Sequence, residues 1–219
     1  MTIKEAISAR HMVRTYTDRP IPEDIIGQLN ERVARMNAAY GVQMKFIAGE
    51  KAPVWGVMRL MGAKSTRNYL LLSSPDIPDA QEKLGYCGID IALFAQTLGL
   101  NSWWVSGSFG KNKARKQSGE AIQAGVIVLG YGATQGVQHK CKTPAEVSSY
   151  EGEMPDWFKA GVDAALMAPT AVNKQAFFLK GRGDKVHIDC SNGAYTDIDR
   201  GIVKYHFEVG AGKENFEWE

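Results

Sequence analysis

Residues 165–181 of the sequence read ALMAPTAVNKQAFFLKG. This stretch begins with an apolar run typical of a helix and closes with a run typical of a strand. The polar turn between them, residues 169–173, offers backbone N–H donors and the side-chain amide of Asn173, groups that suit the edge of a heteroaromatic ring. The turn is far along the chain from the two arginines best suited to hold an anionic ligand, Arg10 and Arg14, and this separation needs an explanation.

The order of helix and strand around the turn also occurs earlier in the chain. Aligning residues 156–181 with residues 24–49 superimposes one helix and one strand of each segment. The same comparison pairs residues 201–211 with a buried helix that begins at Gly85. These matches indicate a partial internal duplication.

The polar turn belongs to the second copy alone. In the aligned first copy, Asn37 and Gly41 stand where the second copy has Pro169 and Asn173. We therefore expect a first half, a polar connecting segment and a partial second half that carries the turn, over residues 1–133, 134–153 and 154–219.

Hydrophobic periodicity predicts an α+β fold. In the first half the predicted helices are 3–14, 23–39, 85–100 and 111–120, and the predicted strands are 44–48, 69–73, 103–105 and 124–129. Helices and strands alternate without regular β-α-β units, which favours a central, mostly antiparallel sheet flanked by helices. The first of these helices would place Arg10 and Arg14 one turn apart on one face. Residues 52–68 have no clean period, and we expect an irregular segment there.

The composition is that of an ordinary globular protein. The 219 residues include 26 lysines and arginines against 24 aspartates and glutamates, a net charge of +2 that is too small to indicate nucleic-acid binding. The three cysteines lack disulfide or zinc spacing, which favours reduced thiols in the cytoplasm. We find no apolar run of signal-peptide or membrane-spanning length, and expect no membrane association.

The sequence contains no strong signature of a catalytic side chain. The glycines at 107–110 and 130–136 miss the spacings of phosphate-binding and dinucleotide-binding loops. The four histidines lack metal-ligand spacing, so we predict no metal site. No serine or cysteine has the context of a nucleophile. If the protein is an enzyme, its chemistry therefore belongs to a cofactor.

Four cations are candidates for binding a phosphate group. Arg10 and Arg14 lie near the N-terminus, and Lys140 and Lys142 follow the strand that ends near Gly130. The two lysines could equally be solvated charges on a polar loop.

Four segments resemble the signatures of FMN-dependent nitroreductases. The N-terminal RHMVRTY (10–16), followed by PIP (20–22), is similar to R-x-S-x-R-x-[FY]…P-[IV]-P, and APTAVNKQ (168–175) is similar to A-P-[ST]-x-x-N-x-Q. LGL (98–100) with WVSGSF (104–109) resembles the L-G-L…W-[IV]-x-G-F segment, and VLGY (128–131) resembles the strand ending in L-G-Y. Together these segments span nearly the whole chain.

The chain departs from the family pattern in two ways. Met12 replaces the usual serine, and Ala176-Phe177 replaces the usual Pro-Trp, so the competence of the site is open. The order also differs, because the family's A-P-[ST] turn follows the first long helix, where this chain has residues 36–41. Family members are usually homodimers that build each flavin site from both subunits. The resemblance therefore implies an internal pseudo-dimer with one flavin site per chain, similar to the TM-type branch of the family.

The resemblance also implies a set of cofactor-binding residues. The phosphate or ribityl chain would be held by side chains of Arg10, Arg14, Lys140 and Lys142 and by the backbone of His11 and Met12. Val105, Ser106 and Gly107 would face the ring near its hydride-accepting nitrogen. Pro169, Thr170 and Asn173 would reach the same ring from the second half.

The implied activity is reduction of FMN by NADH or NADPH, followed by reduction of a nitroaromatic, a quinone or a free flavin, with no catalytic side chain. The protein would be a monomer or a weak homodimer. One alternative is a flavin-binding protein for storage or sensing. A less favoured one is a polyanion-binding module that uses the basic run 111–116, a run that otherwise reads as a solvated helix face.

Overall fold

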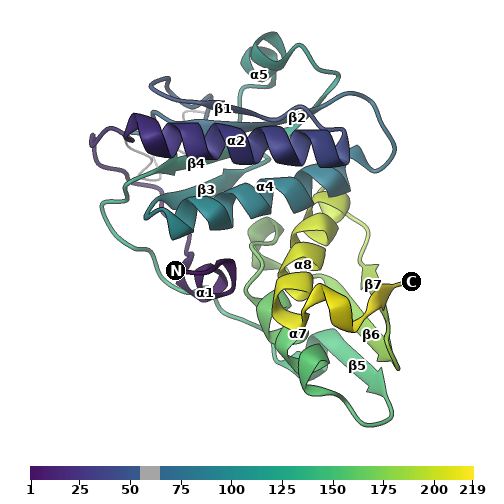
Figure 1. Cartoon of the computed structure of the whole chain (residues 1–219). Helices are drawn as coiled ribbons and strands as arrows, with labels where there is room; N and C mark the ends of the chain where they lie inside the picture. The colour runs from purple at the N-terminus through teal and green to yellow at the C-terminus, as the bar shows by residue number, and fades with distance from the viewer. Residues whose placement is uncertain (55–64) are drawn as a thin grey trace.

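The computed structural model describes residues 1–54 and 65–219, which form two four-stranded sheets joined through helices (Figure 1). The first part contains α1 (Ile3–Ala9), α2 (Glu23–Tyr40), β1 (Lys45–Ile47), β2 (Tyr69–Ser74), α4 (Ala80–Thr97), β3 (Asn101–Val105), α5 (Lys111–Ser118) and β4 (Ile122–Gly130). The second contains α6 (Pro144–Val147), β5 (Ser148–Glu151), α7 (Asp156–Leu166), the 3-10 helix η1 (Ala171–Asn173), β6 (Phe177–Arg182), β7 (Lys185–Cys190), α8 (Thr196–Ala211), the 3-10 helix η2 (Lys213–Asn215) and β8 (Glu217–Trp218).

Residues 55–64, which belong to the stretch expected to be irregular, lie outside the described residues. Among the residues that are described, none of the helices combines the length and the apolarity that a membrane crossing requires.

The first sheet confirms the predicted α+β class. Its strand order is β1-β2-β4-β3, and every neighbouring pair is antiparallel. All residues of the central strand β2 are buried because both faces of the sheet are covered. Leu70 and Leu72 point into the main core with residues of α2 and α4, whereas Tyr69 and Leu71 point into a smaller core on the opposite face, to which α5 contributes Ala114.

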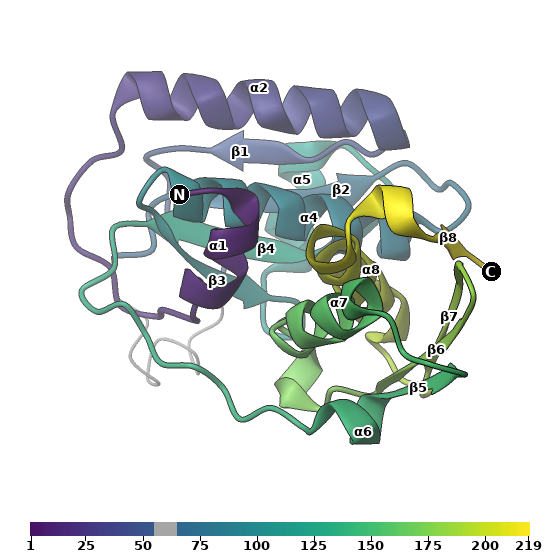
Figure 2. The same ribbon diagram turned by 60° about the horizontal axis from the view of Figure 1, so that its bottom comes forward.

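The second sheet has the order β5-β6-β7-β8, with an antiparallel β6–β7 hairpin between two parallel outer pairs. The buried residues of this second part of the chain include Phe158 of α7, Leu179 of β6 and Phe207 of α8. Figure 2 shows α7 and α8 side by side against this sheet. Strand β5 falls within the expected connecting segment 134–153, so the end of that segment is part of the second sheet.

The two parts meet at a close crossing of α4 and α8. A Cβ atom on Gly85 would lie 2.2 Å from the carbonyl oxygen of Ile198, and one on Gly201 would lie 2.0 Å from the carbonyl oxygen of Glu82. Each glycine thus contacts the residue three positions before the other glycine. Such reciprocity is the geometry of a local two-fold axis, and it joins the two positions that the sequence repeat aligns.

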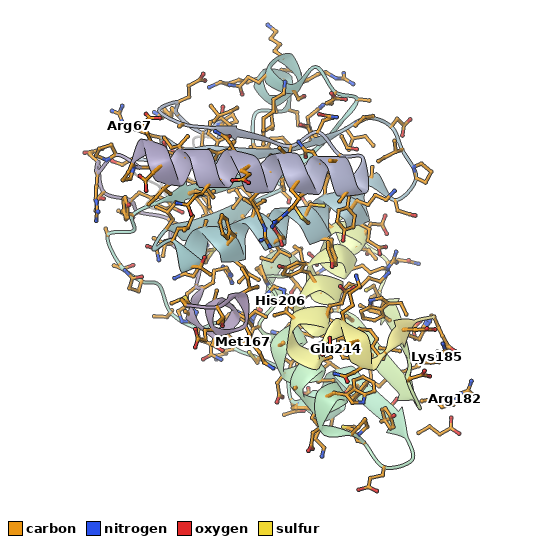
Figure 3. The ribbon with its side chains drawn as sticks, in the orientation of Figure 1. Arg67, Met167, Arg182, Lys185, His206 and Glu214 are labelled. Atoms are coloured by element: carbon orange, nitrogen blue, oxygen red, sulfur yellow. The ribbon has the colours of Figure 1, made fainter. Side chains whose placement is uncertain are left out.

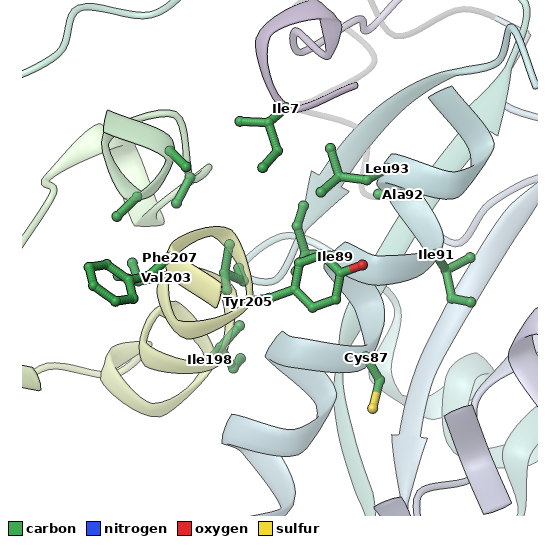
Figure 4. Packing of buried hydrophobic residues seen from close by; sticks show 14 of the residues in the cluster. Ile7, Cys87, Ile89, Ile91, Ala92, Leu93, Ile198, Val203, Tyr205 and Phe207 are labelled. Carbon is green, nitrogen blue, oxygen red and sulfur yellow. The ribbon is translucent and has the colours of Figure 1, made fainter. Parts of the chain in front are cut away.

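A buried polar network stabilises the same junction. Asp90 of α4 is 3% exposed and accepts hydrogen bonds from Arg32 Nε at 2.7 Å and from the Tyr205 hydroxyl at 2.7 Å. Beside this network, Ile89 of α4 lies next to Tyr205 of α8 in the space between the helices, whereas Val203 and Phe207 lie on the opposite side of α8 (Figure 4). The buried carboxylate is therefore fully paired, as a buried charge must be.

The predicted helix over 3–14 is too long. Thr2 and Glu5 form a capping box at the start of α1, but the helix ends at Ala9, and Arg10 is a C-cap residue in extended conformation. The chain then runs beside β3, where the Val13 N–H donates to the carbonyl of Ser102 and the Val13 side chain is buried. This pairing takes the backbone out of the helix, so Arg10 and Arg14 are not neighbours on a helix face.

The other predicted helices and strands of the first half are present with shifted ends. The helix expected from residue 85 begins earlier, at Ala80, and the basic helix ends at Ser118, before Gly119 with φ +77°. In the second half, α7 and β6 confirm the helix and the strand predicted on either side of the polar turn.

Candidate functional site

The segment after α1 carries two arginines without an acidic partner. Arg10 is 6% exposed and its Nε atom has no hydrogen-bond partner, and the half-buried Arg14 also has an unpartnered Nε. Within residues 1–54 and 65–219 no ion pair involves either arginine. Burial lowers the pKa of Arg10 to about 10. A buried cation with an unused donor is costly, so these two arginines are candidates to bind an anion.

Arg14 is further along the same extended segment. Its guanidinium carbon is 6.0 Å from the centroid of the Trp103 ring in β3. Between the two arginines, Met12 forms a parallel bridge with Ser102 and is 47% exposed. The segment therefore lies along β3, which leads to Val105.

Three histidines interact electrostatically with this cluster. Burial is the largest cause that lowers the pKa of His11 and that lowers the pKa of His206 to about 3, and the charge of Arg10 adds to both shifts. His139, from the loop after β4, contributes to both shifts as well. None of the described residues forms a group of three or more His, Cys, Asp or Glu arranged to hold a metal ion.

The loop after β4 connects the arginines with the second half. A Cβ on Gly136 would lie 2.8 Å from the carbonyl oxygen of Met12, so the loop closes directly against the arginine segment. Further along, His139 Nε2 donates to the carbonyl of Leu166, at the end of α7, at 3.0 Å. The loop thus contacts both the arginine segment and the end of α7.

The polar turn is bound to the same loop. The Asn173 side-chain amide donates to the carbonyl of Lys140 at 2.8 Å, and Gln175 Nε2 donates to that carbonyl at 2.7 Å. Lys142 Nζ donates to the carbonyl of Gln175 at 2.8 Å, and the Thr170 hydroxyl accepts from the Gln175 N–H at 3.0 Å. The Asn173 amide and the Lys142 ammonium, both predicted to contact the cofactor, therefore already have partners within the chain, whereas the Lys140 side chain is exposed.

The backbone of the turn is strained. Val172, Asn173 and Gln175 have φ values of +45°, +56° and +45°, which are unfavourable for residues other than glycine. The Ala171 N–H donates to both carboxylate oxygens of Asp199, at 3.1 and 3.0 Å. Burial raises the pKa of Asp199 to about 6. The first turn of α8 thus helps to hold the strained turn in place.

The third predicted group, Val105 to Gly107, lies at the end of β3. Val105 is buried, and the Ser106 hydroxyl accepts from Trp104 Nε1 at 2.8 Å. A Cβ on Gly107 would lie 2.7 Å from the hydroxyl oxygen of Tyr195, the residue that precedes α8. A residue of the second half therefore lies against the segment expected to face the ring.

Helix α8 takes part in two of these interactions. Asp199, which binds the polar turn, and His206, which interacts with Arg10, are two turns apart on one face of the helix, a separation of roughly 10 Å. Pro169 and Thr170 are half-buried beside Asp199. Helix α8 thus contacts the polar turn at one position and interacts electrostatically with Arg10 at another.

Five residues of this region escaped sequence reasoning: Gln175, His139, Tyr195, Asp199 and His206. Gln175 belongs to the quoted motif, but its burial was not evident from the motif. The other four have no local signal, because their roles depend on the packing of α8 and of the loop after β4 against α1 and β3.

Comparisons with known proteins identify similar chains. The family model described as "Putative TM nitroreductase" matches residues 2–211. A crystal structure from Thermotoga maritima, titled a putative nitroreductase, has a TM-score of 0.68 at 22% identity and covers 98% of this chain and 85% of that one. This likeness confirms the nitroreductase-like fold. No curated protein matches this chain.

Two further structures are titled putative nitroreductases in complex with FMN. The one from Desulfovibrio desulfuricans has a TM-score of 0.53 at 14% identity and covers 71% of this chain and 99% of its own. The one from Exiguobacterium sibiricum has a TM-score of 0.51 at 12% identity and covers 67% of this chain and 95% of its own. At these identities the similarity concerns the fold alone.

Proposed function

Because this chain belongs to the TM nitroreductase family, we propose that it is an FMN-dependent oxidoreductase that accepts reducing equivalents from NADH or NADPH and passes them to a small organic acceptor. The observation that carries the proposal is Arg10, a buried cation without a carboxylate partner in the described part of the chain. The contrast with Arg32, which is paired with Asp90, is informative. A charge that the fold leaves uncompensated requires an anion from outside.

The residues around Arg10 fit the phosphate of FMN. Arg10 and Arg14 each have a buried Nε donor without a partner, and guanidinium groups bind phosphate oxygens through two parallel hydrogen bonds. The exposed ammonium of Lys140 could join them, whereas Lys142 would first have to leave the carbonyl of Gln175. His11 and Met12 would contribute backbone groups. The loop after β4 packs closely against both residues at Gly136, which would hold their backbone in place.

The ring would lie between the end of β3 and the polar turn. Residues 105–107 approach it from the first half, and Pro169 and Thr170 approach it from the second. When bound, FMN supplies the hydride chemistry. The chain fixes its position and excludes water, with Tyr195 covering the backbone at Gly107. Because the Asn173 amide holds Lys140, we propose that Asn173 acts on the ligand by fixing the turn.

We also propose that the site is an internal pseudo-dimer site. The two four-stranded sheets and the reciprocal contacts of Gly85 and Gly201 support two halves related by a local two-fold axis. The first half would span residues 1–133, the second 154–219, and the chain between them would connect the halves and add β5. One chain would then suffice for one flavin site, and the protein would act as a monomer or a weak dimer.

The experiment that tests the proposed function is an absorption spectrum of the purified protein after addition of FMN and gel filtration. Flavin that stays with the protein supports the proposal, and its complete loss contradicts it. Oxidation of NADH or NADPH with a quinone acceptor then separates an enzyme from a protein that only stores or senses flavin. RNA binding that weakens strongly with salt, in a colourless protein, would instead favour a polyanion site on α5.

A further inference from the structure

Gln175 is a buried amide where the polar turn meets the loop after β4. The residue is 2% exposed, and its backbone has a φ of +45°, which is unfavourable for a residue other than glycine. A fold that buries a polar side chain and strains the backbone at the same position must hold both in place through local contacts. The contacts of Gln175 therefore indicate its role.

The side-chain amide of Gln175 holds the loop at two backbone positions. Its Nε2 donates to the carbonyl of Lys140 at 2.7 Å, and its Oε1 accepts from the N–H of Lys142 at 2.9 Å. Nε2 also donates to Oδ1 of Asn173 at 3.0 Å. The opposite orientation of the amide would place its oxygen against two other acceptors, so the orientation is fixed. The amide thus fixes the backbone on either side of Cys141.

The backbone of Gln175 adds to the same connection. Its carbonyl accepts from Lys142 Nζ at 2.8 Å, and its N–H donates to the Thr170 hydroxyl at 3.0 Å. Gln175 therefore joins the turn proposed to approach the ring with the loop proposed to reach the phosphate. The Lys140 side chain, in contrast, is exposed, although the backbone that carries it is bound at the carbonyl.

We propose that Gln175 is a positioning residue for Lys140: by holding the backbone of residues 140–142, it directs the exposed ammonium group to the bound phosphate and so sets the preference for FMN over riboflavin. This inference rests on the proposed function, because the phosphate is that of FMN. A lysine side chain loses conformational freedom when its ammonium group binds an anion, and a mobile backbone would add to that cost. A backbone that is fixed before the ligand arrives lowers the cost.

Two flavins that differ in the phosphate separate this role from simple packing. Riboflavin has the ring and the ribityl chain of FMN but no phosphate. In Gln175→Met the side chain keeps a similar length but loses every hydrogen bond of the amide. We expect its affinity for FMN to fall roughly 10-fold, the effect of one charge-assisted hydrogen bond, and its affinity for riboflavin to stay within about 3-fold of the parent.

Two variants that each remove one exposed cation calibrate this result. Lys140→Met should reduce the preference for FMN over riboflavin by a factor similar to that of Gln175→Met. Arg182→Met is the matched control, because Arg182 is an exposed cation at the outer end of the second sheet, away from α1 (Figure 3). It should leave the affinities for both flavins within about 3-fold of the parent.

Gln175→Glu is a second variant of nearly the same shape. It keeps an oxygen for the Lys142 N–H but cannot donate to the Lys140 carbonyl when ionised, and its charge opposes the phosphate. It should therefore weaken the binding of FMN at least as much as Gln175→Met does. Hydrogen exchange of the Lys142 amide, followed by NMR, requires no ligand. Exchange should be faster in Gln175→Met than in the parent and should stay slow in Gln175→Glu.

Three results would overturn the inference: equal loss of affinity for both flavins in the Gln175 variants, unchanged affinity for FMN in them, or a parent that binds FMN no more tightly than riboflavin. Equal exchange of the Lys142 amide in Gln175→Met and the parent would overturn it as well. If Gln175→Met does not fold, the comparison of the two flavins in Gln175→Glu decides. A parent protein that binds neither flavin would instead overturn the proposed function.

Discussion

Gly85 of α4 and Gly201 of α8 each lie where a single added carbon atom would collide with the backbone of the facing helix. The two contacts are reciprocal, and each reaches the residue three positions before the opposite glycine. The crossing therefore depends on the absence of both side chains, and it sets how the two halves face each other.

Replacing Gly201 with alanine should destabilise the protein by about 3 kcal/mol or more, because the neighbouring atom is a backbone carbonyl that cannot move aside. Gly85→Ala should have a similar effect. Gly27→Ala is the matched control, since Gly27 is an exposed residue of α2 with nothing within 4 Å, and alanine should stabilise that helix by roughly 1 kcal/mol. Urea unfolding measures all three. If Gly85→Ala and Gly201→Ala lowered the unfolding free energy only slightly, the two helices would be able to separate without cost.

Replacing Arg10 with methionine should have opposite effects on stability and on ligand binding. The apo protein should become more stable, because a buried charge without a partner is removed. Affinity for FMN should fall roughly 10-fold or more, because a charge-assisted hydrogen bond to phosphate is worth about 1.5–3 kcal/mol. Thermal unfolding without ligand and a fluorescence titration with FMN test the two effects. Arg35→Met, at an exposed position of α2, should change neither substantially.

His206 should make the protein sensitive to acid. The unfolded chain binds a proton at this ring below about pH 6.5, whereas the folded protein does not bind it until about pH 3. The unfolded state therefore binds more protons in this range, and the unfolding free energy falls as the pH falls. Between pH 7 and pH 5 the loss from this group is about 2 kcal/mol. Urea unfolding of the parent and of His206→Gln at both pH values isolates this contribution. Identical losses of unfolding free energy in the two proteins would show that His206 does not cause the sensitivity to acid.

Asp199 should act in the opposite direction. Its pKa is raised to about 6 in the folded protein from an ordinary value near 3.8, so the folded state binds more protons between these limits. The cost of burying its charge is therefore complete above about pH 6, falls to roughly half by pH 5, and disappears below about pH 3.8. Asp199→Asn keeps an oxygen for the Ala171 N–H and removes the charge. The gain in stability relative to the parent should be roughly twice as large at pH 8 as at pH 5, and a gain of equal size at both pH values would contradict this explanation.

How well each helix or strand could be predicted depends on whether its sequence pattern is local. The segment Glu23–Tyr40 has a clear helical period, and the segment Tyr69–Ser74 is uniformly apolar, so both elements were predicted correctly. The helix expected over 3–14 was wrong beyond Ala9, because hydrogen bonding to Ser102 of β3 competes with the helix at Val13. That competition depends on tertiary structure and leaves no local pattern in the sequence.

The candidate site shows the same limit. The arginine segment and the polar turn were identified from short motifs, and the structure joins them through the loop that carries His139 and Lys140. The motifs predicted that Asn173 would face the ligand directly, but its amide is bonded to that loop. The contributions of Tyr195 and His206 depend on the packing of α8 against the first half, which no short motif encodes.

The most direct test of the central claim is sedimentation velocity of the FMN-loaded protein at micromolar concentration, followed at the visible absorbance of the flavin. If both halves of one chain build the site, the flavin should sediment with a species of the single-chain mass, 24.1 kDa. Flavin that sediments only with a species of about twice that mass, or that does not sediment with the protein at all, would contradict a site built within one chain.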